Sequence, residues 1–187
     1  MPVPVEDPFP FPLSFDDGDV ILRAGDAEFK VHICLLRLVS PFFRTMFSLP
    51  QPNVGKSEIP VIPMDDNAAS LDFVLRSIYP LKRPLATSIE QAQKVLEVAE
   101  KLDVEYVAGA VRTSLSELLA AEPNPLRSWA IATRHGLEGA QKAAILRFDP
   151  NSYRPSATPP RELLYVNGLQ YHELVEARKK SFGIRGL

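Results

Sequence analysis

An α+β fold is predicted for this chain, because β-strand patterns are concentrated near its start and helical patterns fill the remainder. The distribution of proline supports the same division. The 187 residues include 18 prolines, nearly twice the usual share of ~5%. Proline-free stretches with apolar periodicity lie between the proline clusters, at residues 13–40, 85–122, 126–149 and 161–187. Because proline is excluded from helix interiors, these stretches are expected to hold the ordered elements.

The first proline-free stretch predicts a β-hairpin. Residues 19–23 form a short β-branched run, and residues 24–26 have the composition of a turn. In residues 27–31, Phe29 and Val31 fall on one face and charged residues fall on the other, as in a half-buried strand.

Helical spacing of apolar residues begins after His32. Ser40-Pro41 has the character of an N-cap followed by proline at the first helical position. We therefore expect a short helix, a break, and a second helix from Pro41 to about Leu49. A weak strand is expected at residues 58–62, and Pro60 within it indicates an edge position.

The rest of the chain is predicted to be helical, with helices delimited by capping residues. The expected N-caps are Asp66, Thr87, Asp103 and Asn124, and Gly136 is expected as the left-handed residue after a helix. The residues expected to face inward around Asp103 are Ala92, Leu96, Ala99, Leu102, Val104, Val107, Val111, Leu115 and Leu118. A helix near residues 137–148 and a helical hairpin at 161–180, broken at Asn167-Gly168, complete the prediction.

Charge and cysteine content exclude several classes of protein. The formal net charge of −2 gives no strong positive field for general nucleic-acid binding. The single cysteine, Cys34, excludes an intramolecular disulfide and a multi-cysteine zinc site, and it fits a reducing compartment. Residues 1–12 contain no lysine or arginine, unlike a signal peptide, and no apolar run approaches ~18 residues. An intracellular protein of the cytoplasm or nucleus, neither secreted nor membrane-bound, is expected.

No pattern in the sequence predicts catalysis, a metal site or a cofactor. Gly55-Lys56-Ser57 lacks the glycine that a phosphate-binding loop needs five residues earlier. The segment starting at His172 lacks the second histidine of a zinc-protease helix, since Glu176 stands in its place. A ligand site in the C-terminal helices would have to use Arg134, His135 and Trp129, and core packing of Trp129 is favoured. We therefore expect no enzyme activity.

Several segments, in the right order, resemble a BTB/POZ domain. The carrying segments are 19–22, 29–32, 40–47, 59–65, 73–79 and 95–104, together with Leu35. The resemblance implies a small β-sheet flanked by a helical cluster, followed here by an all-α extension similar to that of fungal BTB proteins. It divides the chain into a flexible proline-rich tail (1–14), the BTB/POZ domain (15–122) and the extension (123–187).

The resemblance implies a protein–protein interaction module, namely a homodimerising adaptor or scaffold without catalytic activity. In the family, the first helix and the N-terminal segment supply the dimer interface. The corresponding residues of this chain are Phe15, Val20, Ile21, Ile33, Leu36 and Arg37. Phe9, Phe11 and Phe15 either extend this partner surface or pack back on their own domain.

The alternative is a substrate-recruiting adaptor of a cullin-type ubiquitin ligase. The corresponding contacts would be Phe47, Leu49 and Gln51. Family members that recruit cullins often carry glutamate where this chain has Gln51, and the neutral amide makes a weaker hydrogen bond. Many dimeric members also carry a basic residue where this chain has Ile33, near the acidic Asp19.

Overall fold

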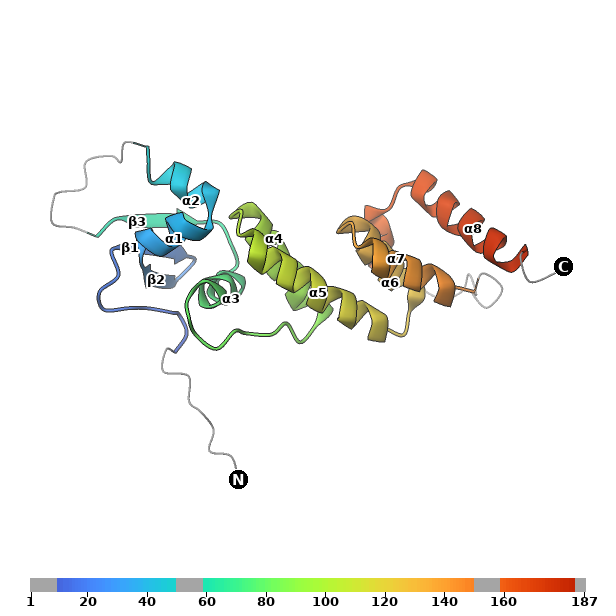
Figure 1. The fold of residues 1–187 in the computed structure, drawn as a ribbon, viewed down its shortest axis with the longest axis horizontal. Coiled ribbons are helices and arrows are strands. Elements are labelled where there is room, and N and C mark those ends of the chain that lie inside the picture. The colour runs from blue at the N-terminus through green and yellow to red at the C-terminus, as the bar shows by residue number, and fades with distance from the viewer. Residues whose placement is uncertain (1–9, 50–58, 150–158, 184–187) are drawn as a thin grey trace, which may run out of the picture. The chain divides into compact units, whose positions relative to one another are not determined.

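The computed structural model describes residues 10–49, 59–149 and 159–183, which form two compact units (Figure 1). The units comprise Met1–Val111 and Arg112–Leu187, and the boundary falls inside helix α5 (Glu105–Ala121). The predicted division after residue 122 lies at the end of this helix. Part of the reason for the earlier boundary is that the Ser128 hydroxyl donates to the carbonyl oxygen of Leu119, which ties the end of α5 to unit 2.

The described strands of unit 1 form one sheet in the order β2-β1-β3. Strands β1 (Val20–Ala24) and β2 (Ala27–Val31) are antiparallel, which confirms the predicted hairpin. Strand β3 (Val61–Met64) pairs in parallel with β1 at the edge of the sheet. The α+β class is therefore confirmed.

The register of the hairpin explains its two faces. Val20 lies opposite Val31 and Leu22 lies opposite Phe29, and all four side chains are fully buried. The pair Arg23 and Glu28, on the other face, forms an exposed ion pair at 2.7 Å. Alternation with a period of two thus buries one face of the hairpin in the core.

The edge strand begins later than the sequence predicts. It starts at Val61, and Pro60 precedes it with its carbonyl oxygen accepting the Ile21 N–H at 2.9 Å. Pro63 lies within the strand, where the edge position tolerates the missing donor. Glu58 lies outside the described residues.

The helices of unit 1 follow the predicted order. They are α1 (Ile33–Val39), α2 (Pro41–Met46), α3 (Ala68–Ile78), α4 (Ile89–Lys101) and the first part of α5. Ser40 caps α2 as predicted, since its side chain accepts from the Phe43 N–H. Two other caps lie one residue later than predicted: Asn67 replaces Asp66, and Ser88 replaces Thr87. At both positions the structure selects the neighbouring side chain that reaches the N–H three residues on.

Asp103 does not act as the N-cap that the sequence predicts. Its φ of 53° is left-handed, and it follows the last turn of α4. The Val104 N–H donates to Ala99 O and the Asp103 N–H donates to Glu100 O, the hydrogen bonds of a Schellman motif. Gly136 occupies the same position after helix α6 (Pro125–Arg134) with a φ of 64°, as predicted.

Residues 10–15 pack against the rest of unit 1, in contrast to the flexible tail predicted for residues 1–14. Leu13 is fully buried, and its N–H donates to Asp72 Oδ1 at 2.9 Å. Arg76 pairs with the same carboxylate at 2.5 Å and also donates to Pro10 O. The two charged side chains of α3 therefore bind the backbone of this segment. Residues 1–9 lie outside the described part.

Gly18 is required where this segment approaches the hairpin. A Cβ atom at residue 18 would lie 2.9 Å from the backbone of Lys30 and Val31, closer than real Cβ contacts. The Asp19 N–H, next to it, donates to Val31 O. Only glycine fits this close approach without a shift of the backbone.

Unit 2 contains the end of α5, α6, α7 (Glu138–Arg147), the 3₁₀ helix η1 (Arg161–Tyr165) and α8 (Gly168–Gly183). Its core consists of Leu126, Trp129, Ala130, Ala144, Phe148 and Leu174. Trp129 is thus a core residue, as expected. Asn124 caps α6 ahead of Pro125, also as predicted. On α5, Leu119 is buried in place of the predicted Leu118, which is only half-buried.

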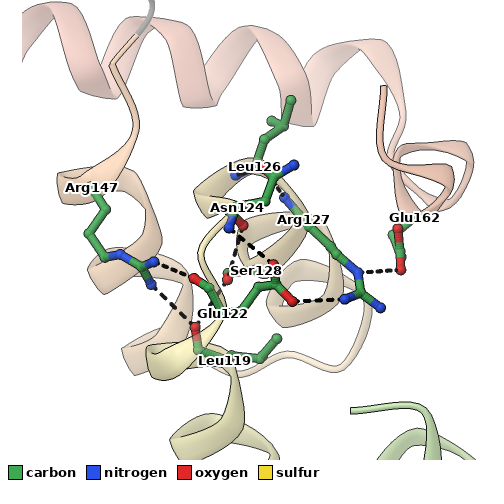
Figure 2. Close-up of polar contacts among 8 residues, drawn as sticks. All are labelled: Leu119, Glu122, Asn124, Leu126, Arg127, Ser128, Arg147 and Glu162. Carbon is green, nitrogen blue, oxygen red and sulfur yellow. Dashed lines mark hydrogen bonds and ion pairs between the residues drawn. The ribbon is translucent and has the colours of Figure 1, made fainter. Parts of the chain in front are cut away.

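Polar contacts hold the connections of unit 2 in place (Figure 2). Arg127 forms ion pairs with Glu122 at 2.7 Å and with Glu162 at 2.8 Å, so it joins α6 to both η1 and the residues after α5. Arg147 donates to Leu119 O and to Glu122 O. Its guanidinium therefore satisfies carbonyl groups at the end of α5 that have no partner within the helix.

Candidate protein-interaction surfaces

Helix α1 is fixed in place by acidic and aromatic residues of unit 1. The Ile33 N–H, at the start of the helix, donates to Asp19 Oδ1 at 2.7 Å. His32 Nε2 lies 3.2 Å from Asp17 Oδ1, and the His32 N–H donates to the Tyr79 hydroxyl at 2.9 Å. The Asp19 carboxylate therefore accepts the first N–H of α1. Residue 33 is isoleucine, so this carboxylate has no basic side chain opposite it at that position.

Phe15 packs on its own unit. Its ring stacks on Tyr79 with centroids 4.4 Å apart and lies 5.2 Å from the His32 ring. Phe11 makes an edge contact with Phe29 but remains 57% exposed. The sequence left open whether the N-terminal aromatic residues extend a partner surface or pack on their own domain. Phe15 packs on its own domain, whereas Phe11 retains exposed surface. Phe9 lies outside the described residues.

Burial divides the six residues predicted for a dimer interface. Val20 and Leu36 are fully buried in the core of unit 1, so they have no surface to offer a partner. Phe15, Ile21 and Ile33 are half-buried, and Arg37 is exposed. Sequence patterning could not separate these cases, because strand β1 and the short helix α1 both carry apolar residues on both sides.

The outer side of helix α1 forms what we call the α1 face, composed of Ile33, Cys34, Arg37 and Leu38. Leu38 is 72% exposed, and the thiol of Cys34 is free and exposed. Leu36, on the opposite side of the same helix, anchors it to the core. The α1 face is therefore a supported apolar surface with one cation, a composition found at protein interfaces.

The first turn of α2 is joined to the end of α4 by Ser40. Its fully buried hydroxyl accepts from the Phe43 N–H at 3.0 Å and donates to Leu102 O at 2.6 Å. This bond brings the residues on either side of Leu102 next to α2, although they are about sixty positions away in sequence.

The result is a shallow depression of about 560 Å³, which we call the α2 pocket. Its lining residues are Pro41, Phe42, Thr45, Met46, Leu49, Lys101 and Asp103. Phe42 is 38% exposed and Leu49 is 59% exposed. Apolar side chains thus lie beside two charged ones, an arrangement suited to a protein segment with an apolar anchor.

Of the three predicted cullin contacts, the structure describes Leu49 and Phe47, and the two differ in exposure. Leu49 is exposed and lines the α2 pocket. Phe47 is half-buried and stacks on Phe43 at 5.9 Å, so much of its role is internal packing. Gln51 lies outside the described residues. Lys101 and Asp103 were missed as surface partners of α2, because no local pattern links them to it.

One phenol near the α1 face has a shifted pKa. Burial raises the pKa of Tyr79 from 10.0 to about 12, and the hydrogen bond from the His32 N–H opposes this rise. Its hydroxyl therefore stays protonated and accepts that bond across the neutral pH range. No group of three or more potential metal ligands occurs among the described residues. None of the helices there combines the length and hydropathy needed to cross a membrane.

Comparison with known proteins agrees with this architecture. Residues 14–119 match the model of the BTB/POZ domain. The chain belongs to the BTB/POZ family. The domain is a protein-interaction module, so the exposed surfaces of unit 1 are candidate docking sites.

Two curated relatives each cover about three fifths of the chain. Kelch-like protein 35 of Mus musculus is 34% identical over 116 residues, covering 61% of this chain and 20% of the relative. Kelch-like protein 35 of Homo sapiens is 34% identical over 124 residues, covering 61% of this chain and 21% of the relative. The chain spans about a fifth of the length of these curated relatives.

Proposed function

We propose that this chain is an intracellular adaptor without catalytic activity that forms a homodimer through the α1 face. The observation that carries this proposal is the exposure of Leu38 beside Arg37 on a short helix that Leu36 anchors to the core. The Leu38 side chain is 72% exposed, and association through the α1 face would remove this apolar surface from water.

Sedimentation velocity with Leu38→Asp tests the homodimer. A carboxylate buried in an apolar interface is strongly unfavourable, so the variant should be monomeric at concentrations where the parent chain is a dimer. Leu85→Asp is the matched control, because Leu85 is 75% exposed in unit 1 but lies outside the α1 face. A parent chain that sediments as a monomer at tens of micromolar would reject the homodimer.

Cys34 provides a second readout of the same interface. It is the single cysteine of the chain, so any disulfide it forms within this protein must join two copies. If the α1 faces meet across a twofold axis, mild oxidation should yield a covalent dimer, and Leu38→Asp should suppress it. Cys34→Ser should abolish the covalent species while leaving the sedimenting dimer intact.

A second candidate function, recruitment by a cullin scaffold, is favoured by the α2 pocket. This pocket contains Leu49, one of the positions that the family resemblance assigns to a cullin contact. Binding of purified cullin should weaken in Leu49→Ala and Phe42→Ala but not in Leu146→Ala, an exposed control on α7. Absence of binding to the parent chain would reject this candidate and leave the homodimer untouched.

A further inference from the structure

Asp103 combines an unusual backbone conformation with a side chain that has no partner among the described residues. It occupies the left-handed position of the Schellman motif after α4, with a φ of 53°. In the same motif after α6, the chain uses Gly136. Glycine adopts this conformation without steric cost, while aspartate is tolerated at some cost. A charged residue at this position invites a functional explanation.

The carboxylate of Asp103 has no structural partner in the part of the chain that the structure describes. The residue is exposed, and none of the side-chain hydrogen bonds or ion pairs there involves it. Its backbone makes the Schellman bond to Glu100 O, which any residue at this position could make. The structure therefore gives the backbone of Asp103 a role but leaves its carboxylate for another purpose.

The charges around the α2 pocket do not cancel. Lys101 Nζ lies 3.0 Å from Asp66 Oδ1, and the Asp66 side chain is only 6% exposed. Asp66 is not among the residues that line the pocket, so this pair neutralises the lysine from outside the lining. Asp103 then supplies the uncompensated charge among the residues that line the pocket, and that charge is negative. The complementary ligand places a cation next to an apolar group.

We propose that Asp103 is a specificity-determining residue of the α2 pocket and selects a partner protein segment that carries lysine or arginine beside an apolar anchor. The anchor occupies the surface of Phe42, Met46 and Leu49, and the basic side chain pairs with Asp103 at the rim. This inference rests on the α2 pocket being a docking site, as in the second candidate function.

Peptides selected from a phage-displayed random library on the full chain test this proposal. Those whose binding is lost in Phe42→Ala should carry a basic residue, and their Kd should rise about 2- to 5-fold in Asp103→Asn. Replacing the basic residue by glutamine should weaken binding to the parent chain but cause no further loss in Asp103→Asn, because both changes remove one interaction. Asp26→Asn is the control for loss of an exposed carboxylate in unit 1.

Asp103→Gly separates recognition from folding. Since glycine suits the left-handed position, this variant should melt no more than about 3 °C below the parent chain while losing peptide affinity as Asp103→Asn does. A much lower melting temperature would assign the aspartate a structural role and overturn the proposal. The proposal would also be overturned if the Phe42-dependent peptides were acidic, or if they bound Asp103→Asn with unchanged affinity. In that case the α2 pocket would still be a docking site. Absence of any Phe42-dependent peptide would reject the pocket as a docking site as well.

Discussion

Ser40 uses one hydroxyl group both to start a helix and to join two helices. It accepts the Phe43 N–H as the cap of α2 and donates to Leu102 O at the end of α4. Its complete burial means that water cannot replace either bond after a substitution. The short α2 and the pocket beside it therefore depend on a side chain without exposed surface.

We predict that Ser40→Ala lowers the free energy of unfolding by about 2 kcal/mol, the sum of a lost cap and a buried carbonyl left without its donor. Urea unfolding followed by circular dichroism measures this change. Ser88→Ala is the matched control, because Ser88 caps α4 at an exposed position and should cost about 1 kcal/mol or less. Equal effects of the two substitutions would contradict the role given to the Leu102 bond.

A second prediction at this scale concerns the ionisation of Tyr79. The phenolate should form only near pH 12, because burial raises the pKa of this residue from 10.0 to about 12. In unfolded chains the same phenol ionises near pH 10, so its contribution to stability is intact below pH 10 and is lost as the pH rises to about 12. Absorbance titration of tyrosinate should show a late component that is smaller in Tyr79→Phe. Burial also raises the pKa of Tyr106, so part of the late component remains in the variant. Identical titration curves would contradict the burial argument.

At the scale of elements, local patterns predicted most of the structure because their signals are local. The hairpin follows from alternation, and the starts of α2 and α6 follow from Ser40-Pro41 and Asn124-Pro125. Where two neighbouring residues can both cap a helix, composition alone misplaced the cap by one residue. The start of β3 was also misplaced, because its register is set by parallel pairing with β1, some forty residues earlier in the chain.

The candidate surfaces were less predictable than the elements. Leu49 was recognised because it closely follows the family segment 40–47, whereas Lys101 and Asp103 come next to it through a hydrogen bond that spans 62 positions. The predicted dimer residues Val20 and Leu36 are core residues, since the side of a short helix or strand that faces the core depends on its tertiary neighbours. Contacts distant in sequence therefore decide which apolar residues remain on the surface.

The packing of the N-terminal segment leads to a prediction for one element. Leu13→Ala should cost about 2–4 kcal/mol, because it removes a fully buried side chain and leaves a cavity. It should also release residues 10–15, so their amide hydrogens should exchange faster than in the parent chain. Phe11→Ala is the control, since Phe11 belongs to the same segment but is 57% exposed. Unchanged exchange in Leu13→Ala would show that Asp72 and Arg76 hold the segment alone.

At the scale of the whole molecule, each unit has its own core, and the single tryptophan lies in only one of them. Trp129 is 1% exposed in the cluster formed with Ala130, Phe148 and Leu174, all within unit 2. The core of unit 1 is formed by other residues, including Leu22, Phe29, Phe43 and Leu96. Tryptophan fluorescence therefore reports on unit 2, while circular dichroism reports on both units.

We predict that the two units unfold as separate cooperative transitions, because each has a hydrophobic core of its own. Ser40→Ala should then shift part of the circular dichroism transition to lower urea concentration while the Trp129 fluorescence midpoint stays unchanged. The reciprocal variant is Phe148→Ala in unit 2, which should shift the fluorescence midpoint because it removes a buried ring from the cluster around Trp129. If Ser40→Ala also shifts the Trp129 fluorescence midpoint, the continuous helix α5 couples the two cores into one folding unit.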